Sequence, residues 1–305
     1  PCIRDPAAAC WVARLMPETH DSRPIGVFDS GLGGLTAVRE LFRVLPHESV
    51  VYFGDTARLP YGSKSRETVT HFSLEIAAFL LRQNIKCLLV ACNTASSYAL
   101  DTLAARLEIP VTGVIEPAAR AAVTASPHGR IGVIGTYGTV GSGAYPAAIG
   151  REAPGAAVIA RACPLFVPLI EEGWIDHPVT RQVADEYLLE LRNAGLESMI
   201  LGCTHYPLIA PLIAGLMGPA VTLVDSGAEA ARAVATMLHE RGQLAPAGDA
   251  QQRFYLSDEP RNFTRIAEGF LGRPLPPPTI VDETDVAWFE RTHPGSALGA
   301  QGGRP

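Results

Sequence analysis

The chain has 305 residues, of which 47% are hydrophobic, and carries a formal net charge of −6. This length can bury one large core or two of ordinary size, and we expect two domains. The negative charge without a basic cluster gives no electrostatic reason to expect nucleic acid or a membrane as partner. Because no apolar run approaches the roughly 20 residues that span a bilayer, we expect a cytoplasmic protein.

The two ends of the chain differ in composition from the rest. Residues 1–23 do not begin with Met and follow no clear period, so we expect a disordered N-terminal extension. Met16 is the start of translation that we favour. Residues 291–305 are rich in Gly, Pro, Ala and Ser, which predicts a mobile C-terminal tail.

Between these ends, short runs typical of strands alternate with segments of helical period. This alternation predicts βα units and mainly parallel sheets flanked by helices, the α/β class. After the first strand, apolar residues recur at helical spacing from Leu35 to Leu45, and Ser65 is a predicted N-cap for a later helix. The predicted strands cover residues 25–28, 50–53, 87–91, 111–115, 131–134, 156–160, 198–201, 221–224 and 254–256.

The first predicted strand ends in a glycine-rich turn that begins with Asp29 and Ser30. Glycines let the backbone approach a ligand, and the amides of the following helix can bind a carboxylate or phosphate. The alternative is a dinucleotide fingerprint, with Asp55 as the ribose-binding acid. That match is incomplete, because Thr36 stands at the third fingerprint position, so we do not expect NAD.

Two cysteines stand at equivalent points of the pattern, each just after an apolar run. Cys92 is followed by Asn93 and Thr94, and Cys203 by Thr204 and His205. In open α/β folds ligands bind at the carboxyl edge of the sheet, so two such edges would present two thiols to one small molecule. The alternative is that both cysteines are inert packing residues.

The remaining cysteines do not share this context. Six cysteines are too few and too scattered for a disulfide framework, and none forms a C-x-x-C pair, so we expect free thiols and no metal site. The spacing of the eight histidines suggests no metal cluster either. The cysteines outside the pair are Cys2, Cys10, Cys87 and Cys163.

Three other segments carry weaker signals. Residues 54–64 form a long polar connection that suits a ligand-contacting loop, although Pro60 to Gly62 could be a simple turn. Thr136 follows another strand and supplies a hydroxyl. Glu171 belongs to a pair of carboxylates that would ordinarily face solvent.

Taken together, these segments resemble the glutamate racemases of the aspartate/glutamate racemase family. The resemblance runs from about Ile25 to the region of Val281, with every motif in order. The motifs that carry it are FDSGLGG at 28–34, GDT at 54–56, PYG at 60–62, CNT at 92–94, GT at 135–136, EEG at 171–173 and GCTHYP at 202–207.

The resemblance implies two pseudo-symmetric α/β domains with the active site in the cleft between them. It places the first domain at 24–116 plus 226–285 and the second at 117–225. It implies no cofactor and no metal, a small-molecule substrate, glutamate, and D-glutamate for peptidoglycan synthesis, cell-wall biogenesis and cell shape. A homodimer is the assembly we consider.

By match of motif, the resemblance also implies the roles of the site residues. Cys92 and Cys203 would be the two bases, with Asp29 attending the first and His205 the second. Asp55 and Glu171 would be further supporting acids. The residues that would line the substrate are Asp29, Ser30, Tyr61, Gly62, Asn93, Thr94, Thr136, Thr204 and His205.

Racemisation gives a reason for this residue set. Inversion by proton exchange needs a base on one face of the α-carbon and an acid on the other, which two thiols can supply. Many amino-acid racemases instead use pyridoxal phosphate on a lysine. Of the two lysines, Lys86 begins a strand that we expect to be buried, so it is not expected to bind pyridoxal phosphate. Lys64 remains the alternative. The competing functions are an aspartate or related racemase, and a binding protein with packing cysteines.

Overall fold

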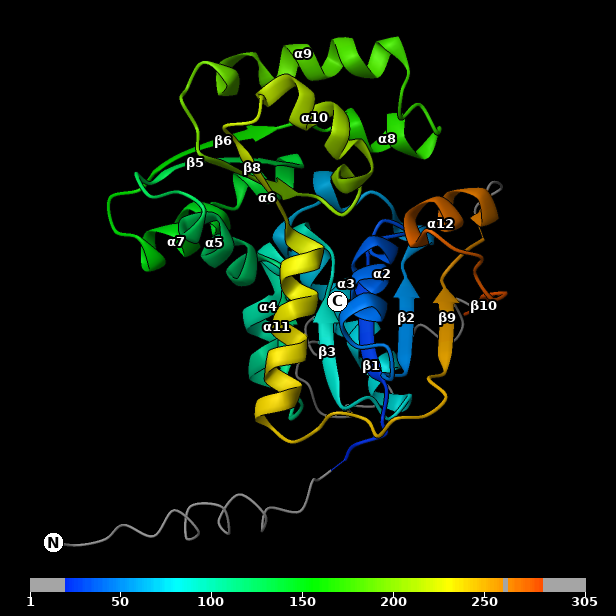
Figure 1. Ribbon diagram of the computed structural model, residues 1–305. Coiled ribbons are helices and arrows are strands. Elements are labelled where there is room, and N and C mark those ends of the chain that lie inside the picture. The colour runs from blue at the N-terminus through cyan, green and yellow to red at the C-terminus, as the bar shows by residue number, and fades with distance from the viewer. Residues whose placement is uncertain (1–19, 260–262, 282–305) are drawn as a thin grey trace, which may run out of the picture.

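The computed structural model describes residues 20–259 and 263–281, which form two parallel β-sheets, one above the other in Figure 1, with helices packed around both. Every strand pair in the described chain is parallel. Parallel strands need crossover connections, and helices supply them here. The sequence prediction of an α/β fold is therefore confirmed.

The lower sheet contains six strands within the described residues, in the order β10-β9-β2-β1-β3-β4. Strands β2, β1 and β3, which lie side by side inside the sheet, are buried along their whole length, as the apolar runs predict. The bounds are β1 Ile25–Asp29, β2 Val50–Gly54, β3 Cys87–Val90, β4 Val111–Gly113, β9 Gln252–Leu256 and β10 Thr279–Ile280.

The upper sheet contains four described strands in the order β6-β5-β7-β8. The order β2-β1-β3-β4 in the lower sheet is the same arrangement, so β1 corresponds to β5 and β3 to β7. This equivalence confirms two pseudo-symmetric units. The bounds are β5 Arg130–Gly135, β6 Ala157–Ala162, β7 Ser198–Gly202 and β8 Thr222–Asp225.

The helices follow the strands in regular alternation. Ser65 caps α3, since its side chain accepts a hydrogen bond from Thr68 N at 3.2 Å, as predicted. The bounds are α2 Leu35–Val44, α3 Arg66–Arg82, α4 Asn93–Arg106, α5 Ile115–Thr124, α6 Tyr137–Gly141, α7 Ala144–Glu152, α8 Phe166–Glu171, α9 Pro178–Arg192, α10 Ala210–Met217, α11 Ser226–Glu240 and α12 Phe263–Leu271, with 3-10 turns at η1 Thr56–Arg58, η2 Tyr61–Ser63 and η3 Tyr206–Ile209.

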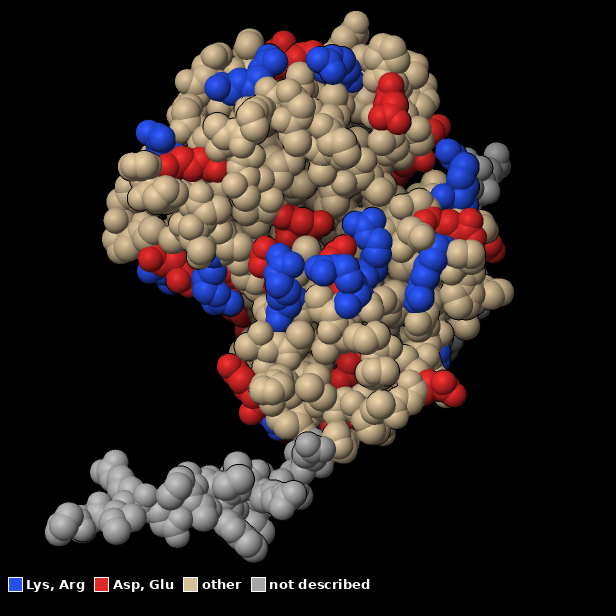
Figure 2. Space-filling model, viewed as in Figure 1, with Lys and Arg blue, Asp and Glu red and all other residues tan. Residues whose placement is uncertain are grey.

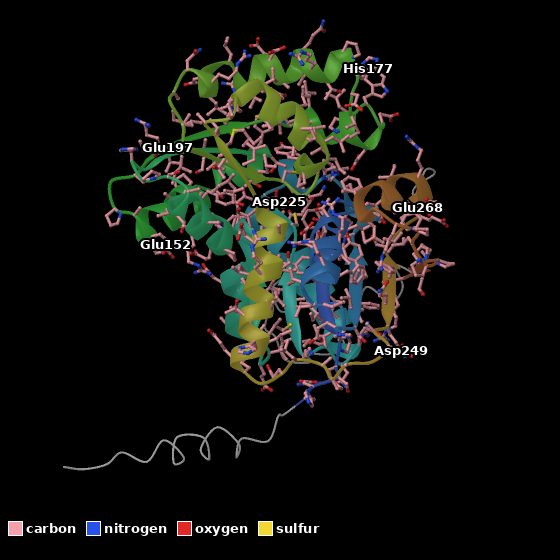
Figure 3. All side chains as sticks on the ribbon, viewed as in Figure 1. Glu152, His177, Glu197, Asp225, Asp249 and Glu268 are labelled. Carbon is pink, nitrogen blue, oxygen red and sulfur yellow. The ribbon has the colours of Figure 1, made fainter. Side chains whose placement is uncertain are left out.

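The chain leaves the lower sheet after β4 and returns to it through α11 (Figure 1). Asp225, labelled in Figure 3, caps this helix by accepting hydrogen bonds from Gly227 N at 2.9 Å and Ala228 N at 3.2 Å. Strands β9 and β10 then extend the lower sheet. The domain boundaries at 24–116 with 226–285, and at 117–225, stay a prediction.

Most of the N-terminal and C-terminal segments lie outside the residues that the structure describes. Residues 1–19 and 282–305, which include Met16, Cys2, Cys10 and the predicted tail, lie outside the described residues. Asp21, inside the predicted extension, is described, and its carbonyl accepts a hydrogen bond from Lys86 Nζ at 2.7 Å. Lys86 is fully buried and also pairs with Glu48 at 2.5 Å, so its ammonium group is held by protein partners.

The predicted strands differ from the structure by one or two residues at several ends, and two differences have a clear physical reason. The strand predicted at 111–115 ends at Gly113, and α5 begins at Ile115, because apolar residues serve equally well at the buried start of a helix. The short strand β10 was not predicted, since its two residues are exposed and give no alternation to recognise.

The surface agrees with the sequence prediction that no basic cluster is present. Figure 2 shows Lys and Arg interspersed with Asp and Glu on the face in view, with no extended field of one sign. No helix of the described chain is both long enough and apolar enough to cross a membrane.

Candidate active site

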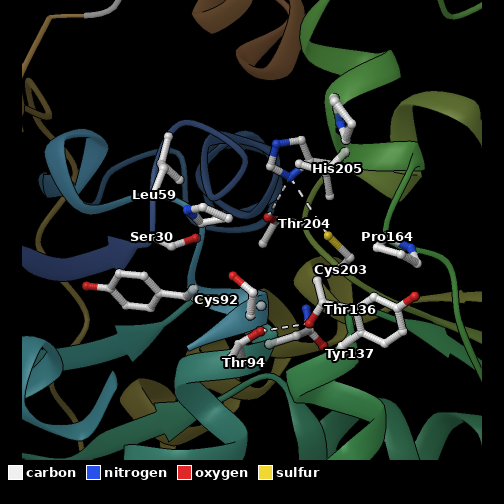
Figure 4. A pocket seen from close by; sticks show the side chains of 17 residues that line it. Ser30, Leu59, Cys92, Thr94, Thr136, Tyr137, Pro164, Cys203, Thr204 and His205 are labelled. Carbon is white, nitrogen blue, oxygen red and sulfur yellow. Dashed lines mark hydrogen bonds between the residues drawn. The ribbon is translucent and has the colours of Figure 1, made fainter. Parts of the chain in front are cut away.

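A cavity of about 170 Å³ lies where the carboxyl ends of the two sheets face each other (Figure 4). Both thiols of the predicted pair, Cys92 and Cys203, line it. The other residues that line it are Ser30, Leu59, Pro60, Tyr61, Gly62, Ser63, Asn93, Thr94, Thr136, Tyr137, Pro164, Val167, Pro168, Thr204 and His205.

Cys92 stands between β3 and α4 as the N-cap of the helix. Its backbone is extended, and its sulfur accepts a hydrogen bond from Ala95 N at 3.4 Å. A thiol takes the position that Ser or Asp usually occupies in a cap, so the helix itself orients the sulfur. The side chain is 5% exposed, which leaves it open only to the cavity.

Cys203 occupies the equivalent point after β7 and has a different neighbour. Its sulfur lies 3.8 Å from His205 Nδ1, and His205 Nε2 lies 2.9 Å from Glu171 Oε1. Figure 4 shows the imidazole ring beside the sulfur of Cys203 and the hydroxyl of Thr204. The thiol, imidazole and carboxylate form a line in which each group can polarise the next.

The two thiols therefore differ in their electrostatics. Burial raises the pKa of Cys92 to about 12, and the nearby charge of Asp29 acts in the same direction. Burial alone would lower the pKa of His205, but its contacts with Cys203 and Glu171 outweigh this and raise the pKa to about 10. At neutral pH, Cys92 is a neutral thiol and His205 is a cation beside Cys203.

Asp29 lies behind the cavity wall rather than on it. Its carboxylate is fully buried and accepts a hydrogen bond from Gly31 N at 3.1 Å. Burial raises its pKa, and the positive charge of His205 counteracts part of that rise. Its Oδ1 has no hydrogen-bond partner among the described residues, and an unsatisfied buried oxygen calls for an explanation such as a functional role.

The loop of Cys203 packs against the lower sheet. Thr36 Oγ1 donates a hydrogen bond to the carbonyl of Thr204 at 3.0 Å. A Cβ added to Gly33 would lie 2.4 Å from Thr204 Oγ1 and 2.5 Å from His205 Nδ1, so only glycine permits this approach. The glycine-rich turn that resembled a dinucleotide fingerprint is thus filled by protein side chains.

The loop of Cys92 packs against the upper sheet in the corresponding way. The hydroxyl of Thr94 lies 3.0 Å from that of Thr136 and 3.2 Å from that of Thr139. Thr136 also caps α6 by accepting from Thr139 N at 3.2 Å. Each thiol loop therefore rests on the first strand–helix turn of the opposite sheet, which ties the two halves of the cavity together.

Asp55 and Tyr61 form a supporting layer. Arg58 Nε donates to both carboxylate oxygens of Asp55, at 2.9 and 2.8 Å, and Ser257 Oγ donates at 2.9 Å. The Tyr61 hydroxyl donates to the same carboxylate, while its ring lines the cavity. Asp55 thus holds Tyr61 in place and does not itself line the cavity, unlike a catalytic acid that touches the ligand.

Sequence reasoning nominated only one part of the apolar wall, the predicted ligand-contacting loop at 54–64. Leu59 and Pro60 come from the loop after β2, and Tyr137 begins α6 with 65% of its surface exposed. Pro164, Val167 and Pro168 come from the segment around the start of α8. Nothing in their spacing marks them, because short loops carry no period from which burial can be inferred.

The residues present do not suggest a metal or a pyridoxal lysine. No group of three or more His, Cys, Asp or Glu side chains in the described chain is arranged to hold a metal ion. Lys64 closes the turn η2 and is not among the residues that line the cavity. Cys87, Cys92, Cys163 and Cys203 are free thiols, as expected.

The fold and the site define a two-unit α/β protein in which two thiols line one small cavity. A family model described as Asp/Glu/Hydantoin racemase matches residues 26–234. The chain belongs to this racemase family.

Three relatives illustrate the match. Glutamate racemase from Geobacter metallireducens is 52% identical over 254 residues, covering 83% of this chain and 94% of that protein. The crystal structure of glutamate racemase from Francisella tularensis in complex with D-glutamate aligns with a TM-score of 0.80 at 39% identity, over 86% of this chain and 98% of that one. The crystal structure of glutamate racemase from Thermus thermophilus in complex with beta-chloro-D-alanine aligns with a TM-score of 0.79 at 46% identity. The alignment covers 88% of this chain and 100% of that one.

Proposed function

We propose that this protein is a glutamate racemase that interconverts L- and D-glutamate by a two-base mechanism with two cysteines and no cofactor. The observation that carries the proposal is the pair of thiols at equivalent strand ends lining one cavity. The relatives at 39–52% identity named above are glutamate racemases, and one of them binds D-glutamate.

In the reaction, one sulfur acts as thiolate and removes the α-proton, while the opposite thiol donates its proton to the other face of the α-carbon. The C–H bond breaks on one face as a new C–H bond forms on the other. The charge that develops on the α-carboxylate is stabilised by fixed donors. After one turnover the two sulfurs have exchanged protonation states, so the reverse reaction uses the same groups in opposite roles.

The electrostatics favour one starting state. His205 Nδ1 lies 3.8 Å from the sulfur of Cys203 and can exchange a proton with it, whereas burial and the charge of Asp29 raise the pKa of Cys92. We therefore assign Cys203 as the first base and Cys92 as the first acid. The product state has the opposite distribution, and solvent protons must return the protein to its resting state.

Supporting roles follow from the contacts. Glu171 orients His205, and Asp55 orients Tyr61, so both are positioning residues. Asp29 lies behind the cavity wall, so its carboxylate would attract a substrate ammonium through its charge and not by direct contact. The backbone amides and side chains that would bind the rest of the substrate belong to Ser30, Tyr61, Gly62, Asn93, Thr94, Thr136, Thr204 and His205.

Three wider statements belong to the same proposal. The product D-glutamate would serve peptidoglycan synthesis in the cytoplasm. The active protein would be a homodimer, which light scattering on the purified protein can test. No membrane or nucleic-acid partner is part of the proposal.

The test uses purified protein freed of pyridoxal phosphate, incubated with L-glutamate in deuterated water. We expect the optical rotation to fall to zero while deuterium enters at the α-carbon. A parallel incubation with L-aspartate should react at least about 10-fold more slowly, a discrimination that a pocket fitted to one methylene can supply. No change with glutamate would contradict the proposal, and a faster reaction of aspartate would reassign the substrate.

A further inference from the structure

A buried chain of hydrogen bonds crosses from one thiol-bearing loop to the other, and of its members only Asn93 belongs to a racemase motif. It begins at Tyr145 on α7, passes through Asn93 and Ser226, and ends at the carbonyl of Leu201 in β7. Asn93 follows Cys92 directly, and Leu201 precedes Cys203 by two residues. The chain therefore joins the backbone segments that carry the two sulfurs.

The contacts have a single consistent direction. The Tyr145 hydroxyl donates to Asn93 Oδ1 at 2.6 Å, Asn93 Nδ2 donates to Ser226 Oγ at 3.2 Å, and the Ser226 hydroxyl donates to Leu201 O at 2.9 Å. Because a serine hydroxyl has one proton, its donation to Leu201 leaves it to accept from Asn93. The amide of Asn93 is thus fixed in one orientation on the cavity wall.

Tyr145 touches both loops with different parts of its side chain. Its hydroxyl holds Asn93, while its ring packs on Gly202, the residue just before Cys203. A Cβ added to Gly202 would lie 2.7 Å from Ile134 O and 3.1 Å from Tyr145 Cε2, so the backbone of β5 excludes a side chain there and the ring lies close to the glycine. The tyrosine is 1% exposed and well packed, which makes it a rigid spacer between the loops.

We propose that Tyr145 and Ser226 are positioning residues that fix the placement of the two thiols relative to each other by holding Asn93 between the two sheets. The inference rests on the proposed function and deepens it. Transfer of a proton to one face and from the other is sensitive to displacements of less than 1 Å, because both sulfurs must reach the α-carbon in the same bound state. Neither residue lines the cavity, so they act through Asn93 and not on the substrate.

The test compares Tyr145→Phe and Ser226→Ala with a matched control, Ser198→Ala. Ser198, the first residue of β7, is a buried serine like Ser226 and also donates to a backbone carbonyl, Ala122 O at 3.2 Å. Its hydroxyl also lies 2.8 Å from that of Ser126. It lies at the opposite end of β7 from Cys203. The control therefore loses comparable hydrogen bonds without touching the thiol loops.

We expect kcat with glutamate to fall about 10- to 100-fold in Tyr145→Phe and Ser226→Ala, with KM changed by less than about 3-fold. Ser198→Ala should lose a similar amount of stability to urea and keep its kcat. Since both residues act through one amide, the double variant should lose little more than the worse single variant. A rise in KM at constant kcat, full additivity, or an equal loss of kcat in Ser198→Ala would overturn the proposal.

A second measurement does not depend on racemase activity. Hydrogen–deuterium exchange of the backbone should accelerate in peptides around both Cys92 and Cys203 in each variant, and only near the base of β7 in Ser198→Ala. If the wild-type protein left glutamate unchanged while this joint loosening occurred, the proposed function would fail and the coupling of the two loops would stand. Loosening of one loop alone would contradict the coupling.

Discussion

The loops of Cys92 and Cys203 occupy equivalent places in two sheets that share a four-strand arrangement, yet their surroundings differ. Cys92 caps a helix and has the carboxylate of Asp29 nearby, whereas Cys203 has an imidazole that is backed by Glu171. The pseudo-symmetric fold supplies two opposed thiols, and the local side chains make them chemically unequal. Geometry and protonation state are thus set by different parts of the sequence.

The largest effect should come from removing either sulfur. Cys92→Ser and Cys203→Ser should each lower the rate of racemisation by about 10³-fold, because a serine hydroxyl is a much weaker base and acid at neutral pH. Polarimetry in both directions measures the loss. Cys87→Ala is the matched control, since Cys87 is a buried free thiol at the far end of β3. An equal loss in the control, or retained activity in the serine variants, would return both cysteines to a packing role.

A second test addresses the inequality of the thiols directly. At pH 7.5, iodoacetamide should modify Cys203 at least about 10-fold faster than Cys92, because the thiolate is the nucleophile. The two side chains are 6% and 5% exposed, so access does not explain a difference. Labelling of Cys92 should rise as the pH approaches about 12. Mass spectrometry of the peptides gives both rates, and equal rates would mean that the inequality is absent in solution.

His205 should affect Cys203 more than Cys92. His205→Gln removes the cation and should slow alkylation of Cys203 and racemisation by about 10- to 100-fold, the range for loss of a charge-assisted contact. If alkylation of Cys92 slowed by the same factor, the variant would have disturbed the whole cavity and not one thiol.

The same residue makes stability depend on pH. The pKa of His205 is raised from its ordinary 6.5 to about 10, so its charged contacts contribute fully below pH 6.5. That contribution declines as the pH rises from 6.5 and is lost above about 10. The free energy of unfolding, measured with urea, should therefore fall more steeply across this pH interval in the wild type than in His205→Gln. Parallel pH profiles would show that His205 is not charged in the folded protein.

Glu171 should give the smallest effect. Its side chain is 34% exposed, so solvent screens its charge, and Glu171→Gln keeps a hydrogen bond to His205. We expect racemisation to fall about 3- to 10-fold and the upper pH limit of activity to move down, since the pKa of His205 loses one of its supports. A loss as large as that of Cys203→Ser would make Glu171 a principal acid instead of a positioning residue.

Much of the fold and the centre of the site could be predicted from the sequence. Apolar runs located β1 and β3, and the two cysteines stood out because both follow such runs. Tyr145 and Ser226 could not be found this way, because their contacts with Asn93 join residues 52 and 133 positions apart. The role of Glu171 came only from the family resemblance, since a carboxylate on a short helix has no distinguishing local pattern.

The most direct test of the two-thiol account is the fate of the α-hydrogen in the first few per cent of turnover. L-Glutamate with ordinary hydrogen at the α-carbon is mixed with the protein in deuterated water. The two enantiomers are separated, and mass spectrometry measures the deuterium content of each. Two bases predict that D-glutamate carries deuterium at the α-carbon while the remaining L-glutamate carries almost none, because the donating thiol has exchanged with solvent. D-Glutamate that retains the original hydrogen would mean that one base carries the proton between faces, and the account would be wrong.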